Sequence, residues 1–392
     1  MTENKETGCT TFLLRTLPVW SYVESAHGFK KVVKRLKVKP HEFYDTTPTI
    51  TTFGSIHSMK QMPHSAHDWL IGSNGSLAHI NLKTGALSAS EEFPTGILAL
   101  STYKDIVMVC GWNTPLQLWR NHKVIWSSEP VYRYQCAENS GLWCSFSRYL
   151  QSRGHLVAYL TREDKRLILV DIDQVLDNLE KKKATPNDYK EIDRDVEEFD
   201  MDKGGNLYSV SCNGDMKKNG NKFGKLSLNY SSLNALAVIG NYIVTGGIAP
   251  DKSEDNEYGY HQQNLIGVFH IKGGKNLSSL GYEINSSVSD QIMRLCVFEH
   301  KDIVVGVAAR EYTYIDVFAF WKNKIVLVKR DIDLSVPALE SQMQKFEEIL
   351  NQREYQTLLC GLRLDNEKQV SKNGRKRVLI YGHVPIKMLT IV

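Results

Sequence analysis

The sequence lacks the short motifs that mark the commonest catalytic sites. It contains no G-x-S-x-G nucleophile elbow, no Walker phosphate loop and no G-x-G-x-x-G dinucleotide fingerprint. Its paired glycines, at 204–205, 246–247 and 273–274, lie at predicted strand ends and turns, and no predicted helix follows them to present N–H groups to a phosphate. We therefore expect a protein that is not an enzyme and that takes no cofactor and no small-molecule substrate.

Long apolar runs are also missing. No run approaches the roughly 18 residues that a membrane-spanning helix requires. The N-terminal segment MTENKETGCTTFLLRTLPVW carries acidic residues and only a short apolar stretch, unlike a signal or transit peptide. The seven cysteines include no CxxC pair, and several of them lie inside apolar runs. This pattern predicts reduced, buried thiols and favours a cytoplasmic or nuclear protein with no membrane span.

Positive charge is concentrated near the start of the sequence. The formal net charge of the chain is +4, and residues 1–40 hold eight Lys and Arg against three Glu, a net +5. The remainder is close to neutral, which argues against a globally basic nucleic-acid binder and for a local basic arm. With 42% hydrophobic and 23% charged residues, the 392-residue chain has enough apolar side chains for a substantial core.

A pattern of short β-prone segments repeats along the chain. Seven units follow one another, at residues 67–85, 97–121, 142–173, 196–228, 233–250 with 264–274, 292–330, and 355–365 with 377–392. In each unit a first strand ends in a turn, a second ends in small residues or Gly, and a third ends in an aromatic or aliphatic residue. Runs of four to eight residues rich in Val, Ile, Tyr and Thr predict strands. Their spacing of roughly 40–55 residues is typical of four-stranded propeller blades.

This pattern resembles the WD-repeat β-propeller family over residues 59–392. The nearest match to the family's Trp-Asp pair is LWR at 118–120, and Asp105 and Asp302 correspond to the Asp that holds the turn in many repeats. The Trp-Asp pair itself is absent, and the family's Gly-His pair is not in register, so the blade count stays open by one. The resemblance implies an all-β propeller of seven blades, with six or eight blades as alternatives. Two separate β domains are the structural alternative.

A propeller whose chain ends on a strand needs a partner strand from elsewhere. The last residues, PIKMLTIV, predict a strand. Because an unpaired blade edge exposes main-chain donors and acceptors, we expect an N-terminal strand to complete the last blade, from residues 47–57 or 10–20. We divide the chain into an N-terminal arm at 1–45 and a propeller at 46–392.

Three segments interrupt the predicted blades. Residues 174–198 are highly charged and predict a helix, a loop and a short second helix, whereas residues 250–263 are acidic and predict a loop. Residues 335–354 predict an amphipathic helix, with Ser335 as its N-cap and Pro337 in its first turn. Its apolar stripe consists of Val336, Leu339, Met343, Phe346 and Leu350. The stripe either packs on the propeller or binds a protein partner.

Two tryptophans at predicted loop ends, Trp112 and Trp126, are further candidates for binding a protein partner, because buried aromatic side chains carry much of the binding energy of interfaces. Trp119 and Trp143 are expected to pack between blades instead. The predicted partner-binding residues are therefore Trp112, Trp126, Leu339, Met343, Phe346 and Leu350.

The strongest functional candidate is the basic segment HGFKKVVKRLKVKPH at 27–41. Its helical and strand periodicities disagree, so both interpretations stay open. Its basic residues are Lys30, Lys31, Lys34, Arg35, Lys37 and Lys39, and a second basic hairpin tip ends in Arg375, Lys376 and Arg377. Such residues contact phosphate backbones, dock on acidic proteins, or keep an edge strand from pairing with another chain. The hairpin tip also fits a nuclear-import signal.

Two other groups have the residue types that bind metals or transfer protons. His64 and His67 lie in a predicted loop, but no neighbouring Cys or Glu completes a zinc pattern. Asp171 and Asp173 share one face of a predicted strand end, where a solvated strand terminus explains them better than a cation site does. We predict no metal site.

These observations predict a non-catalytic propeller scaffold that binds other protein subunits in a larger intracellular complex. The alternative function is a propeller subunit that associates with RNA or DNA through the basic arm at 27–41. A third interpretation, an enzyme with its site in the central channel, requires perturbed acids or histidines clustered there.

Overall fold

The computed structural model describes the chain between Val38 and Ile391, with gaps. The described residues are 38–42, 56–62, 65, 67–88, 91–111, 116–128, 150–161, 165–228, 230–249, 263–283, 291–300, 303–310, 314–321, 323–333, 359–364, 376–382 and 387–391. These residues form β-strands almost throughout, together with the helix α3 (Ile172–Glu180). Within them, no helix has the length and apolar character needed to cross a membrane.

The strands pair antiparallel in five four-stranded sheets and one seven-stranded sheet. The seven-stranded sheet contains β2 (Ser58–Gln61), β3 (Asp68–Gly72), β4 (Asn74–Asn81), β5 (Glu91–Tyr103), β6 (Ile106–Gly111), β7 (Gln117–Arg120) and β8 (Lys123–Ser127). The next sheet contains β9 (Leu150–Arg153), β10 (Leu156–Leu160), β11 (Leu167–Asp171) and β12 (Lys190–Asp193).

Four further four-stranded sheets follow along the chain. The first contains β13 (Val196–Met201), β14 (Leu207–Ser211), β15 (Asp215–Lys218) and β16 (Asn221–Lys225). The second contains β17 (Ser232–Ile239), β18 (Tyr242–Ile248), β19 (Gln263–His270) and β20 (Lys275–Glu283). The third contains β21 (Ile292–His300), β22 (Ile303–Arg310), β23 (Tyr314–Trp321) and β24 (Lys324–Asp333). The last contains β25 (Leu359–Leu364), β26 (Lys376–Gly382), β27 (Lys387–Ile391) and β1 (Val38–Glu42).

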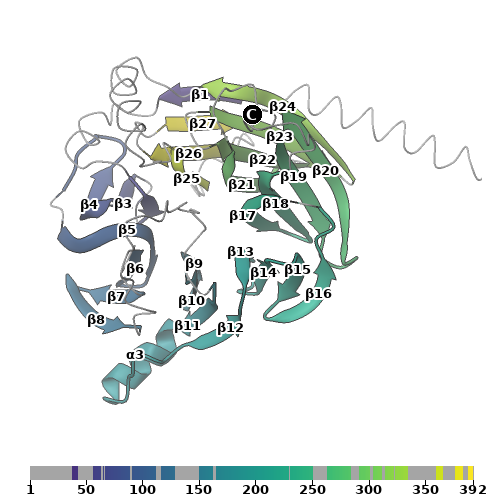
Figure 1. Cartoon of the computed structure of the whole chain (residues 1–392). Coiled ribbons are helices and arrows are strands. Elements are labelled where there is room, and N and C mark those ends of the chain that lie inside the picture. Colours follow the sequence, from purple (N-terminus) through teal and green to yellow (C-terminus); the bar gives the residue numbers. More distant parts are fainter. Residues whose placement is uncertain are drawn as a thin grey trace, which may run out of the picture.

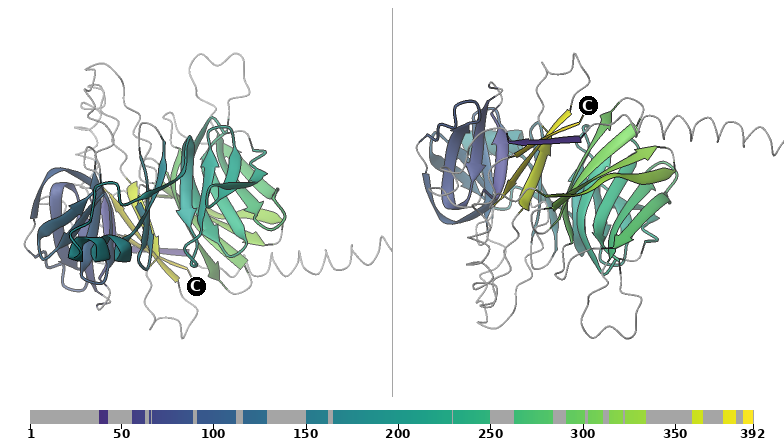
Figure 2. Two further views of the ribbon diagram at one scale, coloured as in Figure 1. Left: turned by 90° about the horizontal axis from the view of Figure 1, so that it is seen from below. Right: turned by 90° about the horizontal axis from the view of Figure 1, so that it is seen from above.

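The sheets are arranged radially about a central axis, as predicted for a propeller (Figure 1). The innermost strands contact one another in sequence: β2 with β5, β5 with β9, β9 with β13, β13 with β17, β17 with β21, and β21 with β25. Because β25 also contacts β2, this series returns to its start. Figure 2 shows the ring edge-on, with the strands running between its two ends. The alternative of two separate β domains does not fit this closed series of contacts.

Strands from the two ends of the sequence share the last sheet. β1 pairs with β27 over five residues, from Val38 opposite Ile391 to Glu42 opposite Lys387, and β26 pairs along the other edge of β27. The expectation that an N-terminal strand completes this sheet agrees with the pairing. Both expected segments, 47–57 and 10–20, were wrong for this role, because β1 already occupies the free edge of β27.

The long strand β5 belongs to two parts of the seven-stranded sheet. Its first half pairs with β4, from Glu91 opposite Leu77 to Gly96 opposite Asn74. Its second half pairs with β6, from Ile97 opposite Gly111 onward. The sheet therefore consists of two four-stranded units that are joined through β5.

Five of the innermost strands share a feature that the sequence pattern did not reveal. Each has a β-bulge close to its start, so that one residue has no partner on the next strand. The bulged residues are Leu98, Glu197, Asn234, Met293 and Cys360. Bulges increase local twist, which helps each sheet leave the central axis at an angle to its neighbour.

The charged segment at 174–198 differs from its prediction. Its first part is helical, as α3, but Lys190–Asp193 form the strand β12 and not a second helix. This short, charged segment is a strand because it completes a sheet by pairing with β11, so tertiary pairing outweighs its low β propensity. The predicted loop at 250–263 and the predicted helix at 335–354 lie outside the described residues, except that Gln263 begins β19.

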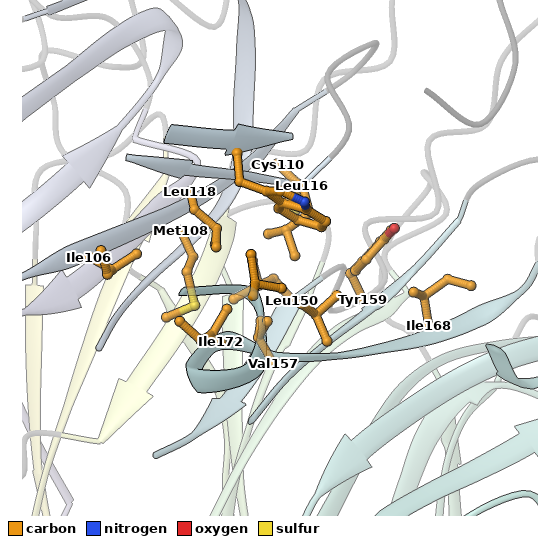
Figure 3. Packing of buried hydrophobic residues seen from close by; sticks show 13 residues of the cluster. Ile106, Met108, Cys110, Leu116, Leu118, Leu150, Val157, Tyr159, Ile168 and Ile172 are labelled. Carbon is orange, nitrogen blue, oxygen red and sulfur yellow. The ribbon is translucent and has the colours of Figure 1, made fainter. Parts of the chain in front are cut away.

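Apolar side chains fill the space between neighbouring sheets. Along β6, Ile106, Met108 and Cys110 face one core cluster, which β9, β10, β11 and α3 complete (Figure 3). The alternate residues Val107 and Val109 face a second cluster on the other side of the sheet. A strand alternates between two faces, and both faces of β6 are covered, which explains its continuous apolar sequence. Burying each such side chain contributes about 1.5–3 kcal/mol.

Polar side chains also connect neighbouring innermost strands. Asn234 Nδ2 donates to the main-chain O of Ile292 (3.0 Å), and Asn264 Oδ1 accepts from the N–H of the same residue (2.9 Å). Asp200 Oδ2 accepts from the N–H of Val238 (2.8 Å). Two of these side chains lie in innermost strands and Asn264 lies in β19, and their bonds to main-chain groups of the next sheet fix the register between sheets.

Candidate functional site

Trp126 in β8 is a predicted partner-binding residue whose side chain the structure describes. Its side chain is only 6% exposed, and its Nε1 donates to the main-chain O of Thr185 at 2.8 Å, in the loop after α3. An indole that is buried with its N–H satisfied within the chain contributes to packing. Its burial therefore favours a packing role over the predicted partner-binding role. Trp119, which was expected to pack, is partly buried against the second core cluster.

Most other predicted site residues lie outside the described part of the chain. The partner-binding residues among them are Trp112, Leu339, Met343, Phe346 and Leu350. The basic residues among them are Lys30, Lys31, Lys34, Arg35, Lys37 and Arg375. These assignments stay predictions. Trp143 and Asp302 also lie outside the described residues.

The backbone brings together the described ends of the two basic segments. Lys39 in β1 lies opposite Thr390 of β27, and Arg377 in β26 lies opposite the same Thr390. Because neighbouring strands are about 4.8 Å apart, the two basic segments meet about 10 Å apart at one end of a single sheet. Of the two interpretations of 27–41, the strand applies to its last residues, which begin β1 at Val38.

A second polar group joins the turn after β5 to the start of α3. Tyr103 Oη donates to Asp173 Oδ2 and Lys104 Nζ donates to Asp173 Oδ1, each at 2.9 Å. The hydrogen bond from Lys104, followed by the one from Tyr103, lowers the pKa of Asp173 below its ordinary value. This contact links neighbouring sheets at the surface. It keeps the Asp173 carboxylate ionised, and both carboxylate oxygens are bound by side chains of the same chain.

The two aspartates at this position do not share a strand face, which corrects the prediction. β11 ends at Asp171, which is the N-cap of α3, and its side chain accepts from the N–H of Gln174 at 3.2 Å. Asp173 lies in the first turn of the helix. An Asp directly before an apolar helical repeat is an ordinary helix-start signal, so the sequence contained the information needed to find this cap.

The opposite end of the ring holds a group of Lys165, Glu197 and Cys212. Lys165 Nζ lies 2.5 Å from Glu197 Oε1 and 3.7 Å from Cys212 Sγ. Partial burial by itself lowers the pKa of Lys165, but the hydrogen bond and charge of Glu197 outweigh it, so the pKa is raised. Burial, followed by the hydrogen bond and charge of Glu197, raises the pKa of Cys212. A thiol that stays protonated is a poor nucleophile, so this group is not a thiolate site.

The most deeply buried charged group joins β22, β23 and β24 to β20, the outer strand of the preceding sheet. Arg310 and Asp316 are 3% and 0% exposed, and Arg310 Nη2 lies 2.8 Å from Asp331 Oδ1. Tyr282 Oη donates to Asp316 Oδ2 at 2.8 Å. Burial raises the pKa of Asp316, although the charge of Arg310 opposes this. The group is buried from solvent and connects two sheets, so its role is to stabilise the packing of these sheets.

Potential metal ligands are dispersed in the described part of the chain. No group of three His, Cys, Asp or Glu side chains that could hold a metal ion occurs there. His67 is described, and its N–H donates to Ser65 Oγ at 3.2 Å, whereas His64 lies outside the described residues.

Known proteins resemble this chain in structure and not in sequence. No family model and no curated protein matches the sequence. A chain from a structure of S. cerevisiae Dbp5 bound to Nup159, Gle1, IP6 and ADP aligns with a TM-score of 0.50 at 14% identity, over 86% of this chain and 89% of that chain. The N-terminal domain of Nup159 aligns with a TM-score of 0.49 at 15% identity, again over 86% and 89%. BamB from Moraxella catarrhalis aligns with a TM-score of 0.46 at 12% identity, over 86% and 82%.

The fold is that of a β-propeller. At these identities the likeness concerns the fold alone, which agrees with the radial sheets and the closed series of innermost strands. The partners of the similar proteins do not transfer to this chain, and propellers carry many unrelated functions.

Proposed function

We propose that this protein is a non-catalytic scaffold, a seven-bladed propeller of the WD-repeat type that binds other protein subunits in a larger intracellular complex. Seven blades result when the seven-stranded sheet counts as two units joined through β5, beside the five four-stranded sheets. The innermost strands support the same count, because β2, β5, β9, β13, β17, β21 and β25 follow one another around the axis.

The observation that carries this proposal is the closure of the ring. β1 and β27 come from opposite ends of the sequence and pair within one sheet, so the whole ring is held as one unit. Loops on such a rigid support are fixed before a partner arrives, which lowers the conformational entropy lost on binding. A closed ring of sheets therefore suits the display of binding loops.

The burial and the pKa shifts of the polar groups support a function without catalysis. Arg310 and Asp316 are sealed from solvent, and the raised pKa of Cys212 disfavours its nucleophilic form. Catalytic groups need access to substrate and a pKa matched to their task. The described charged groups mainly hold sheets together.

The thiols support the expected location in the cytoplasm or nucleus. Cys110, Cys212 and Cys296 are not joined by disulfide bonds. Free thiols persist in reducing compartments, whereas secreted proteins of this kind usually form disulfides.

Purification of the tagged full-length chain from its own cells tests the scaffold proposal. We expect it to elute from a gel-filtration column well above its own mass of 44.6 kDa, with other proteins in stoichiometric amounts. A matched variant that lacks residues 1–42, and therefore β1, should lose those proteins because its loops are no longer fixed. Elution as a 44.6 kDa monomer without stoichiometric partners would contradict the proposal.

A further inference from the structure

A series of lysines follows one end of the ring. In each four-stranded unit, the connection between the third strand and the outermost strand lies at the same end of the ring. We call this end the outer-turn end. A lysine lies in that turn or at the first or second residue of the outermost strand in every unit, including β1, which pairs with the end of β27. These outer-turn lysines are Lys83, Lys123, Lys190, Lys222, Lys275, Lys324 and Lys39.

The outer-turn lysines present their charge to solvent. Lys83, Lys123, Lys190, Lys222 and Lys275 are exposed, and Lys324 is partly exposed. Lys222 pairs with Asp215 at 2.7 Å. Among the residues that the structure describes, Lys83, Lys123, Lys190 and Lys275 have no carboxylate within ion-pair distance. Successive sheets therefore place one mostly unneutralised positive charge after another along the rim.

Three acidic side chains at this end pair with other basic residues, whereas Glu180, Asp202 and Glu299 have no basic partner within ion-pair distance among the described residues. The pairs are Asp105 with Arg120 (2.8 Å), Asp173 with Lys104 (2.9 Å) and Asp177 with Lys181 (2.6 Å). At the other end of the ring Lys165 pairs with Glu197 and Arg310 with Asp331, whereas the exposed Lys225 and Lys329 have no ion pair among the described residues. The outer-turn end therefore differs in having a lysine in every unit.

The two basic segments of the sequence join the same end. β1 and β26 both begin there, since Val38 and Lys376 each lie opposite Ile391, the last residue of β27. Lys39 and Arg377 follow one residue later. Residues that are distant in the sequence therefore extend the series of lysines at the point where the ring closes.

We propose that the outer-turn end binds the phosphate backbone of a nucleic-acid duplex, independently of the scaffold function. A track of separate lysines matches a polymer with regularly spaced phosphates, and each contact releases counterions. Contacts of lysine with phosphate position a protein on the duplex without reading its sequence.

The side chains at this end favour a duplex over other polyanions. Of the large hydrophobic side chains that the structure describes, only Leu87 and Val124 are exposed. Single-stranded nucleic acids bind on exposed aromatic platforms, and protein partners bind through buried apolar or aromatic anchors. A membrane-bound face commonly inserts apolar groups as well. Leu87 and Val124 both lie at the outer-turn end, but on different units, so they form no continuous apolar surface. A lysine series with only two separate apolar side chains agrees best with backbone contacts.

Fluorescence anisotropy with a labelled duplex of about 20 base pairs, titrated with full-length protein at several salt concentrations, tests this proposal. The variant K190Q/K275Q removes two exposed charges at the outer-turn end. The control K225Q/K329Q removes two exposed charges from the last residue of β16 and from the second half of β24. All four substitutions are on the surface, so thermal unfolding should be unchanged.

We expect K190Q/K275Q to bind about 60-fold more weakly at about 0.1 M salt, with a salt slope smaller by about 1.8, because each lost phosphate contact removes about 0.9 from the slope. The control should bind like the unchanged protein. Equal losses in both variants would overturn the proposal, as would absence of duplex binding at low salt. Equal or tighter binding of poly-glutamate, or of vesicles containing phosphatidylserine, with the same response to K190Q/K275Q would assign this end to a protein or a membrane instead.

Discussion

Removing β1 tests whether pairing of the two chain ends holds the ring together. The truncation of residues 1–42 deletes this strand, and the truncation of residues 1–37 is the matched control that keeps it. β1 and β27 pair over five residues. Pro40 is tolerated in an edge strand when its nitrogen faces solvent, so the hydrogen-bonded pairs are those of Lys39 and His41. Each such pair exchanges two main-chain hydrogen bonds, so the deletion removes about four bonds.

The expected loss of stability follows from these bonds. At about 1 kcal/mol net for each hydrogen bond, the deletion lowers the free energy of unfolding by about 4 kcal/mol. This is a large share of the roughly 5–15 kcal/mol that stabilises a typical domain. At a slope of about 3 kcal/mol per molar, the midpoint of urea unfolding falls by about 1.3 M.

Urea unfolding followed by tryptophan fluorescence and far-ultraviolet circular dichroism measures this loss. Both signals should shift together, because an open ring weakens all sheets and not only the last one. A peptide of residues 36–44, LKVKPHEFY, should restore the midpoint in a concentration-dependent manner, since a ligand of the folded state stabilises it. Equal midpoints for the two truncations would refute the reasoning, because β1 would then contribute nothing to closure.

Three substitutions test the interior and one surface group. Replacing Trp126 with Phe should cost about 2 kcal/mol in urea unfolding, from one lost hydrogen bond and a small cavity; an unchanged midpoint would contradict its packing role. Gly306→Ala should cost about 1–3 kcal/mol in the same assay, because an added Cβ would lie 2.0 Å from the buried ring of Phe318, and a neutral result would contradict this contact. Glu197→Gln should lower the pKa of Cys212, because Glu197 helps to raise it. The thiol should then be alkylated faster by iodoacetamide near pH 8. An unchanged alkylation rate would show that Glu197 does not raise the pKa of Cys212.

The repeat pattern predicted the ring but not the strand that closes it. The sequence units fall on the described strands because many of these strands are buried on two faces and are therefore apolar. β1 is different: VKPHE contains Pro40, His41 and Glu42 and has little β propensity. Pro is tolerated because β1 is an edge strand, and pairing with β27 determines its conformation. Local sequence reasoning chose the segments at 47–57 and 10–20 instead.

For the candidate sites too, the sequence predicted the residue types but not their positions in the fold. The basic residues stood out in the sequence as charge clusters, but their position at one end of the ring depends on strand register, which single segments do not encode. The contact of Lys104 with Asp173 likewise joins different sheets. Trp126 was predicted at a loop end, whereas its burial depends on the loop after α3 folding back over β8.

Lysines on outermost strands have two physical explanations, and the sign of the charge does not distinguish them. Charged residues, Lys above all, keep an exposed strand edge from pairing with another chain. The first two residues of the seven outermost strands β1, β5, β8, β12, β16, β20 and β24 hold six Lys and three Glu, a preference that edge protection also predicts. Salt dependence distinguishes the two explanations, because only phosphate contacts release counterions. K190Q/K275Q should lower the salt slope of duplex binding by about 1.8 if these lysines bind phosphates, and should leave it unchanged if they only protect strand edges.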